Sequence, residues 1–117
     1  MATGLIETRP WGEYVILYED ESCKVKLITV KPWCRLSLQF HNHRSEVWTI
    51  ISGTGEAIIY GDVHACKRRS VFQIPVRVTH RISCCGYVAL KFIEVQLGSY
   101  LGEDDIVRLE DDYGRIK

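Results

Sequence analysis

The sequence predicts an all-β domain built as a sandwich or a barrel. Its 117 residues suit one compact domain over residues 1–117, and 46% of them are hydrophobic, which suffices for a core. Short runs rich in Val, Ile, Tyr, Phe and Trp recur roughly every ten residues, with glycine or proline between them. No stretch keeps an apolar period of about 3.6 residues long enough for a core helix.

About eight strands are expected along the chain. In chain order they are residues 13–20, 24–30, 35–41, 47–52, 56–60, 70–75, 80–84 and 88–96. Gly53 and Gly55 separate the fourth run from the fifth, Pro75 ends the sixth, and Gly86 separates the last two. The tail, residues 102–117, is acidic and polar, and we expect a turn followed by a short segment that folds back on the barrel.

Charge and terminal composition exclude several classes of protein. The chain has 15 Lys and Arg residues against 15 Asp and Glu, so no basic surface for nucleic acid or an anionic membrane is expected. The N-terminal stretch MATGLIETRPWG lacks the basic region and apolar run of a signal peptide, and no apolar run is long enough to cross a membrane. We therefore expect a cytoplasmic protein. The five cysteines include no CxxC pair and are expected to be reduced thiols.

The stretch LSLQFHNHRSEVW, residues 36–48, carries side chains suited to metal or proton chemistry. Strand alternation places Gln39, His41 and His43 on one face, opposite an apolar face. On a surface strand this polar face would meet water, whereas in a barrel with a working cavity it would point inward. Glu46 follows across a presumed turn and can fold back beside these residues.

A fourth metal ligand is expected from another strand, where His80 is the candidate. The expected ligand set is Gln39, His41, Glu46 and His80. These nitrogen and oxygen donors suit zinc first and also manganese, iron, cobalt or nickel, and they suit copper(I) poorly. The alternative is a strand whose polar face is exposed to solvent and whose histidines bind no metal. His43 has the right parity but is expected beyond the metal, and His64 is expected to be an exposed loop residue.

These residues resemble the two motifs of the cupin superfamily. Gln39, His41, Glu46 and Gly53 occupy the last four fixed places of the first motif, with glutamine in place of its first histidine, and Pro75 and His80 fit the second. The runs VKPWCRLSLQFHNHRSEVWTIISGTGE and SVFQIPVRVTHRI, and the tail EVQLGSYLGEDDIVRLEDDYGR, resemble the type II mannose-6-phosphate isomerase family. This is the cupin domain often fused behind a mannose-1-phosphate guanylyltransferase. The resemblance covers nearly the whole chain, and the tail is its most specific part.

The resemblance implies a double-stranded β-helix, which is the jelly-roll barrel of cupins. It implies one divalent metal ion held by Gln39, His41, Glu46 and His80, and a phosphosugar substrate, with interconversion of mannose 6-phosphate and fructose 6-phosphate. By analogy with cupins that pair through sheet edges, a homodimer is expected.

Aldose–ketose isomerisation needs a proton-shuttling base and cations for the phosphate group. Glu94, at the end of the run LKFIE, is the first candidate for the base, and His43 is the second. Arginine suits phosphate because its planar guanidinium binds two oxygens at once. The candidate phosphate ligands are Arg35, Arg44, Arg81 and Arg108.

Besides Gln39, the chain departs from the cupin motifs at several positions, among them Asn42, which replaces a histidine. Trp33, Arg69 and Arg77 stand where the motifs have glycine, and Cys84 and Cys85 stand at a turn that usually carries other residues. Some of those glycine positions require positive φ, which a bulky residue adopts only at a cost. One hypothesis is a natural isomerase with a reshaped cavity entrance. The alternative is an engineered or non-catalytic cupin scaffold that keeps its metal site and binds a protein partner or a sugar without turnover.

Overall fold

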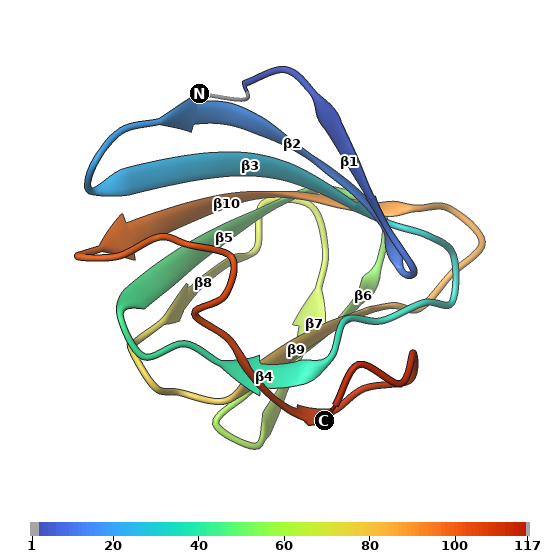
Figure 1. Ribbon diagram of the computed structural model, residues 1–117. Helices are drawn as coiled ribbons and strands as arrows, with labels where there is room; N and C mark the ends of the chain where they lie inside the picture. The colour runs from blue at the N-terminus through green and yellow to red at the C-terminus, as the bar shows by residue number, and fades with distance from the viewer. Residues whose placement is uncertain (1–2, 117) are drawn as a thin grey trace.

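The chain forms two antiparallel sheets in the computed structural model, which describes residues 3–116 (Figure 1). The six-stranded sheet runs in the order β1 (Ile6–Arg9), β2 (Gly12–Glu19), β3 (Cys23–Val30), β10 (Leu90–Gly98), β5 (Arg44–Ser52) and β8 (Val71–Ile74). The five-stranded sheet runs in the order β11 (Val107–Glu110), β4 (Leu38–Phe40), β9 (His80–Cys84), β6 (Gly55–Ile59) and β7 (Asp62–Cys66). Residues 3–116 contain no helix, and hence none long and apolar enough to span a membrane.

Strands far apart in the sequence pair across both sheets. In the six-stranded sheet β10 lies between β3 and β5, and in the five-stranded sheet β9 lies between β4 and β6. The two sheets face each other across a common interior in Figure 1. This arrangement confirms the all-β fold and brings β4, β5 and β9, which carry the expected metal ligands, to one interior.

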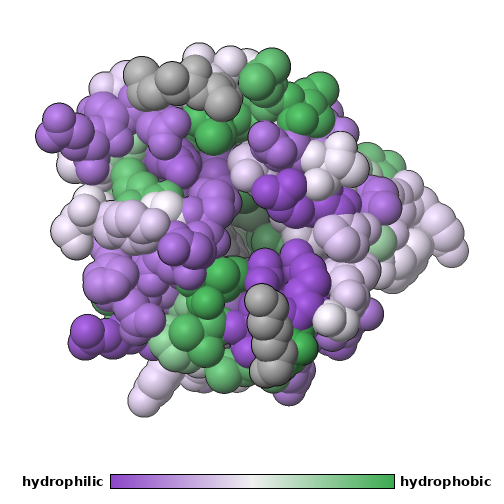
Figure 2. Space-filling view, viewed as in Figure 1, coloured by the Kyte–Doolittle hydropathy of each residue, from purple (hydrophilic) through white to green (hydrophobic). Residues whose placement is uncertain are grey.

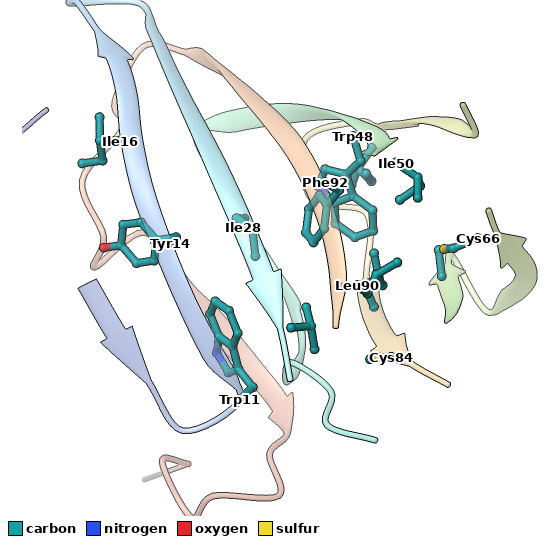
Figure 3. Close-up of a cluster of buried hydrophobic side chains, with 14 residues drawn as sticks. Trp11, Tyr14, Ile16, Ile28, Trp48, Ile50, Cys66, Cys84, Leu90 and Phe92 are labelled. Carbon is teal, nitrogen blue, oxygen red and sulfur yellow. The ribbon is translucent and has the colours of Figure 1, made fainter. Parts of the chain in front are cut away.

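The interior has an apolar end and a polar end. Along β10 the buried residues change from Leu90 and Phe92 to Glu94 and Gln96. The neighbouring strands change in the same direction: Val30, Ile28, Lys26 and Lys24 along β3, and Ile50, Trp48, Glu46 and Arg44 along β5. Figure 3 shows the apolar end, where Trp48, Ile50, Leu90 and Phe92 pack together. Its rigid packing holds the three strands that present the polar groups.

All eight expected strands are present, and the sequence missed three more. These are β1, β7 and β11, which are only four or five residues long and mostly exposed, so no run of buried apolar residues marks them. His64, expected in a loop, lies in β7, although its side chain is exposed as expected. The tail folds back as predicted, because β11 pairs with β4.

The three side chains that replace motif glycines all adopt positive φ. The φ angles are 61° at Trp33, 78° at Arg69 and 66° at Arg77, the left-handed region that glycine occupies without cost. None of the three is among the residues that line the interior cavity. Trp33 instead packs edge-on against Tyr87 on the surface, with ring centroids 5.4 Å apart. All five cysteines lie within the described residues and are free thiols.

Candidate metal centre

Three of the expected ligands meet at the polar end of the interior. His41 follows β4 directly, Glu46 is an inward residue of β5, and His80 begins β9. Their ligand atoms all lie within 4.8 Å of one another, and all three side chains are buried. Two histidines and a carboxylate are the donors that a divalent transition metal prefers, so this cluster is a candidate metal centre.

Both histidines are oriented by main-chain carbonyl groups. His41 Nδ1 lies 2.6 Å from the carbonyl oxygen of Asp105, and His80 Nδ1 lies 3.0 Å from that of Val78. Since a carbonyl oxygen only accepts hydrogen bonds, each Nδ1 carries the proton, and each Nε2 is the atom available to a metal. Burial lowers the pKa of His80, which favours the neutral ring that a metal requires.

Glu46 is held as a carboxylate. Burial acts to raise its pKa, but the contact with His41 and the charge of Arg44 outweigh burial and hold the pKa well below its ordinary value. Its Oε1 accepts a hydrogen bond from Trp48 Nε1 at 2.9 Å. Its Oε2 lies 3.1 Å from His41 Nε2, a contact between two acceptor atoms that requires a proton or a metal ion.

Gln39 lies beside the cluster. It is buried, lines the same cavity, and stands opposite His80 in the pairing of β4 with β9. Its amide nitrogen donates to Ser37 Oγ at 3.1 Å, which leaves the amide oxygen as its free acceptor. The residue therefore fits the expected role of an oxygen ligand, as the fourth member of the set.

Arg44 differs from its expected position. The sequence placed it in a turn, but it is the first residue of β5 and is buried. Its Nε donates to Glu46 Oε2 at 2.9 Å, and its Nη2 lies 3.2 Å from His41 Nε2. The guanidinium therefore balances the charge of Glu46. It also contacts Glu46 Oε2 and His41 Nε2, two atoms that would bind a metal ion.

The cluster opens into a cavity of about 250 Å³. Figure 2 shows the hollow on this face, with hydrophilic residues around much of its rim. The cavity is lined by six basic residues, Arg9, Lys26, Arg44, Arg81, Arg108 and Arg115, and by three carboxylates, Glu46, Glu94 and Glu103. A cationic cavity of this size suits a small anionic metabolite.

Three of the four candidate phosphate ligands line this cavity, namely Arg44, Arg81 and Arg108. Arg81 is engaged elsewhere, since it donates to Glu110 Oε1 at 3.0 Å and to the carbonyl oxygen of Leu36 at 2.9 Å. Arg108 has no carboxylate partner among residues 3–116, and its buried Nε lacks a hydrogen-bond acceptor there. Burial and the charge of Arg115 lower the pKa of Arg108, as expected for a cation that lacks an anion.

Arg35 is not brought to the cavity. It was expected on the face of Gln39, but the run 35–41 is not one continuous strand: Arg35 forms an isolated bridge and β4 begins only at Leu38. The alternation of faces is broken between them. Arg35 instead binds Asp112 through two hydrogen bonds of 2.7 and 2.9 Å, and its side chain is 43% exposed.

The two candidate bases differ in position. Glu94 is buried on β10, lines the cavity, and stands opposite Lys26 on β3 and Trp48 on β5. Burial and the charge of Glu46 raise the pKa of Glu94 to about 8. His43 is exposed, packs against Tyr100 with ring centroids 6.1 Å apart, and does not line the cavity. The structure therefore brings Glu94, and not His43, to the candidate centre.

Sequence reasoning missed several residues that the structure places around the cavity. They are Arg9, Lys26, Glu103 and Arg115 in the lining, and Asp105 behind His41. A signal was present for Lys26. In the strand KVKLITV it lies two and four residues before the core residues Ile28 and Val30, so it shares their buried face. Glu103 and Asp105 lie in the tail, where no strand pattern indicates which side chains point inward.

Known proteins match nearly the whole chain. The family described as "Mannose-6-phosphate isomerase C-terminal" matches residues 5–111. The xanthan biosynthesis protein XanB of Xanthomonas campestris pv. campestris strain B100 is 50% identical over 107 residues. The alginate biosynthesis protein AlgA of Pseudomonas aeruginosa is 48% identical, and the mannose-1-phosphate guanylyltransferase ManC of Salmonella typhimurium is 45% identical. Each match covers 92% of this chain but only 22–23% of the relative, so the chain spans less than a quarter of their length.

Solved structures match the fold at low sequence identity. An RmlC-like cupin from Shewanella frigidimarina superposes with a TM-score of 0.76 at 19% identity, over 86% of both chains. A protein with a double-stranded β-helix domain from Klebsiella pneumoniae superposes with a TM-score of 0.73 at 19% identity, over 92% of this chain and 87% of that one. These likenesses confirm the expected double-stranded β-helix of the cupin type.

Proposed function

Since the chain belongs to the mannose-6-phosphate isomerase C-terminal family, we propose that it is a metal-dependent isomerase that interconverts mannose 6-phosphate and fructose 6-phosphate. The observation that carries this proposal is the buried cluster of His41, Glu46 and His80, with Gln39 beside it, at one end of a cationic cavity. The relatives are about four times as long as this chain, so the activity is proposed for this chain from its own residues.

The donor set suits zinc first, and manganese, cobalt, nickel or iron also fit nitrogen and oxygen ligands. When bound, such an ion supplies Lewis acidity that polarises the sugar carbonyl and stabilises an enediolate. His41, Glu46, His80 and Gln39 would hold it. Asp105 and Val78 orient the two histidines through their carbonyl groups.

Glu94 is the proposed proton-shuttling base. The reaction removes a proton from the carbon next to a carbonyl and returns it one carbon away, so the same group must accept and then donate it. A pKa of about 8 places Glu94 where both protonation states are accessible near neutral pH. Its position on β10, opposite Lys26, brings it to the cavity that would hold the sugar.

Arg108 is the proposed arginine for the phosphate group. Arg44 and Arg81 already bind Glu46 and Glu110, whereas Arg108 faces the cavity without a carboxylate partner in the described part of the chain. A phosphomonoester would supply the acceptor that its buried Nε lacks. Two further features stay predictions: the cytoplasmic localisation expected from the sequence composition, and the homodimer expected by analogy with cupins.

The deciding experiment is turnover of mannose 6-phosphate by the chain after reconstitution with each of the five metals. We expect turnover with at least one metal and its loss when a chelator is added, followed by recovery when the metal is restored. The variant His80→Ala should lose both metal binding and turnover. One tightly bound metal per chain without turnover would contradict the isomerase and favour the second function.

A second candidate function is a cupin scaffold, engineered or natural, that keeps the metal site and binds a protein or a sugar without turnover. The surface pair Trp33 and Tyr87, 61% and 88% exposed, favours a protein partner, because exposed aromatic residues are enriched at interfaces. This function predicts that Trp33→Ala weakens binding of such a partner and leaves metal affinity unchanged.

A further inference from the structure

Two lysines are buried on the inner face of β3, on the polar side of the interior. Lys24 is 5% exposed and Lys26 is 4% exposed, and they point to the same side because they are two residues apart in one strand. Lys26 also lies 4.0 Å above the ring of Tyr14. Buried ammonium groups require anions or strong acceptors beside them, so their partners show what this site binds.

The main anion between the two lysines is Glu103. Its Oε1 lies 2.9 Å from Lys26 Nζ, and its Oε2 lies 3.1 Å from Lys26 Nζ and 3.2 Å from Lys24 Nζ. Lys24 has a second carboxylate, Glu19, at 3.4 Å from strand β2. Glu103 therefore bridges two cations with both of its oxygens, while Glu19 contacts only one.

Glu103 is attached far more loosely than the lysines it binds. It belongs to the β10–β11 segment, residues 99–106, which crosses from one sheet to the other (Figure 1). Its side chain is 46% exposed, whereas the lysines are fixed in the middle of a six-stranded sheet. Lys26 and Glu103 both line the cavity, so an anion that enters the cavity reaches the same ammonium group.

We propose that Lys26, which lines the same cavity as Arg108, and its neighbour Lys24 contribute to the anion subsite that takes the phosphate group of a phosphomonoester, and that Glu103 occupies the two lysines until the ligand displaces it. A phosphate offers three oxygens with more charge than a carboxylate and can bridge both ammonium groups. A phosphate dianion bound to the two lysines would repel the Glu103 carboxylate, so the two anions do not share the lysines. That the ligand is a sugar phosphate rests on the proposed function, whereas the anion subsite itself does not.

The test is the affinity of the chain for inorganic phosphate, measured by calorimetry at fixed ionic strength. Glu103→Gln removes the competing charge and should tighten phosphate binding about tenfold, the effect of losing one charge-assisted contact of roughly 1.4 kcal/mol. Glu19→Gln is the matched control, because it removes a carboxylate from the same Lys24 but not from the cavity lining. Its phosphate affinity should stay within about twofold of the parent chain.

Hydrogen exchange provides a second measurement that does not depend on a variant. Phosphate should speed the exchange of amides in the β10–β11 segment of the parent chain, because Glu103 leaves its anchor, while amides of β3 and β10 stay protected. Phosphate affinity that is unchanged or weaker in Glu103→Gln would overturn the subsite, since Glu103 would then be a structural anchor. Tighter phosphate binding without sugar turnover would support the subsite and contradict the isomerase instead.

Discussion

Arg44 and Glu46 determine the charge of the candidate centre at the residue scale. The two side chains lie two residues apart on the inner face of β5 and form a buried ion pair of 2.9 Å. A divalent ion added to this pair leaves the centre with a surplus of positive charge, since Glu46 is the only carboxylate among the proposed ligands. That surplus favours an anionic substrate or a developing enediolate over a neutral ligand.

The residue that distinguishes the four candidate phosphate arginines is Arg108. Because it is the one that faces the cavity without a carboxylate partner in residues 3–116, Arg108→Ala should weaken inorganic phosphate binding about ten- to a hundredfold. Arg35→Ala is the control, since Arg35 binds Asp112 outside the cavity and its loss should leave the affinity unchanged. Calorimetry measures both constants, and equal losses in the two variants would contradict the assignment.

Glu94 should affect turnover and not metal binding. Replacing it by glutamine keeps the size of the side chain and removes the group that accepts and returns the proton. We expect Glu94→Gln to lower kcat by a factor of about a hundred to ten thousand with unchanged metal content. Steady-state kinetics and metal analysis of the same sample check this expectation. If kcat falls only in proportion to the metal content, Glu94 supports the structure of the metal site and is not the base.

At the scale of elements, the β10–β11 segment couples the tail to the metal ligands. The Asp105 carboxylate accepts hydrogen bonds from the main-chain nitrogens of Asn42 and His43, both at 2.9 Å, and its carbonyl group orients His41. Asp105 therefore fixes both the turn after β4 and the imidazole ring of His41, which begins that turn. The segment that carries this residue is also the one that carries Glu103.

We expect Asp105→Ala to lower metal affinity about ten- to a hundredfold. The variant loses the side-chain hydrogen bonds to Asn42 and His43, so the main-chain carbonyl of residue 105 is no longer held in place against the His41 ring. Competition with a chromophoric chelator measures this affinity without any need for turnover. Asp104→Ala is the matched control, since Asp104 is an exposed neighbour in the same segment and its side chain binds only Tyr100 within residues 3–116. If both variants bind metal as the parent chain does, Asp105 has no part in positioning the ligand.

Strand alternation explains what the sequence could and could not predict. It correctly placed Gln39 and His41 on one polar face, which the structure shows to be buried, although it also placed the exposed His43 there. It failed at Arg35, where an interruption of the strand moves the side chain to another face and no residue type marks the interruption. Arg44 was misplaced for a related reason, since β5 begins earlier than its apolar run does. Pairings such as β11 with β4 are long-range and leave no local signal.

For the whole molecule, the candidate centre joins the two sheets. Glu46 belongs to the six-stranded sheet, whereas His80 belongs to the five-stranded sheet and His41 follows a strand of that sheet. The apolar end of the interior holds the sheets together by packing, whereas ion pairs and hydrogen bonds surround the candidate centre at the polar end. A metal ion bound there would connect the sheets at the end where polar contacts replace apolar packing.

Metal binding should therefore stabilise the whole fold. With free metal at about 100 times Kd, linkage gives about 2.7 kcal/mol of added stability, and a chain of this length should show a rise in Tm of roughly 10 °C. Calorimetric melting with and without a chelator measures this shift. The same metal should leave the Tm of His80→Ala almost unchanged, because that variant loses one of the two histidine ligands and with it the metal affinity. If metal does not change the Tm of the parent chain, the cluster does not bind a metal ion, and Arg44 alone balances the charge of Glu46.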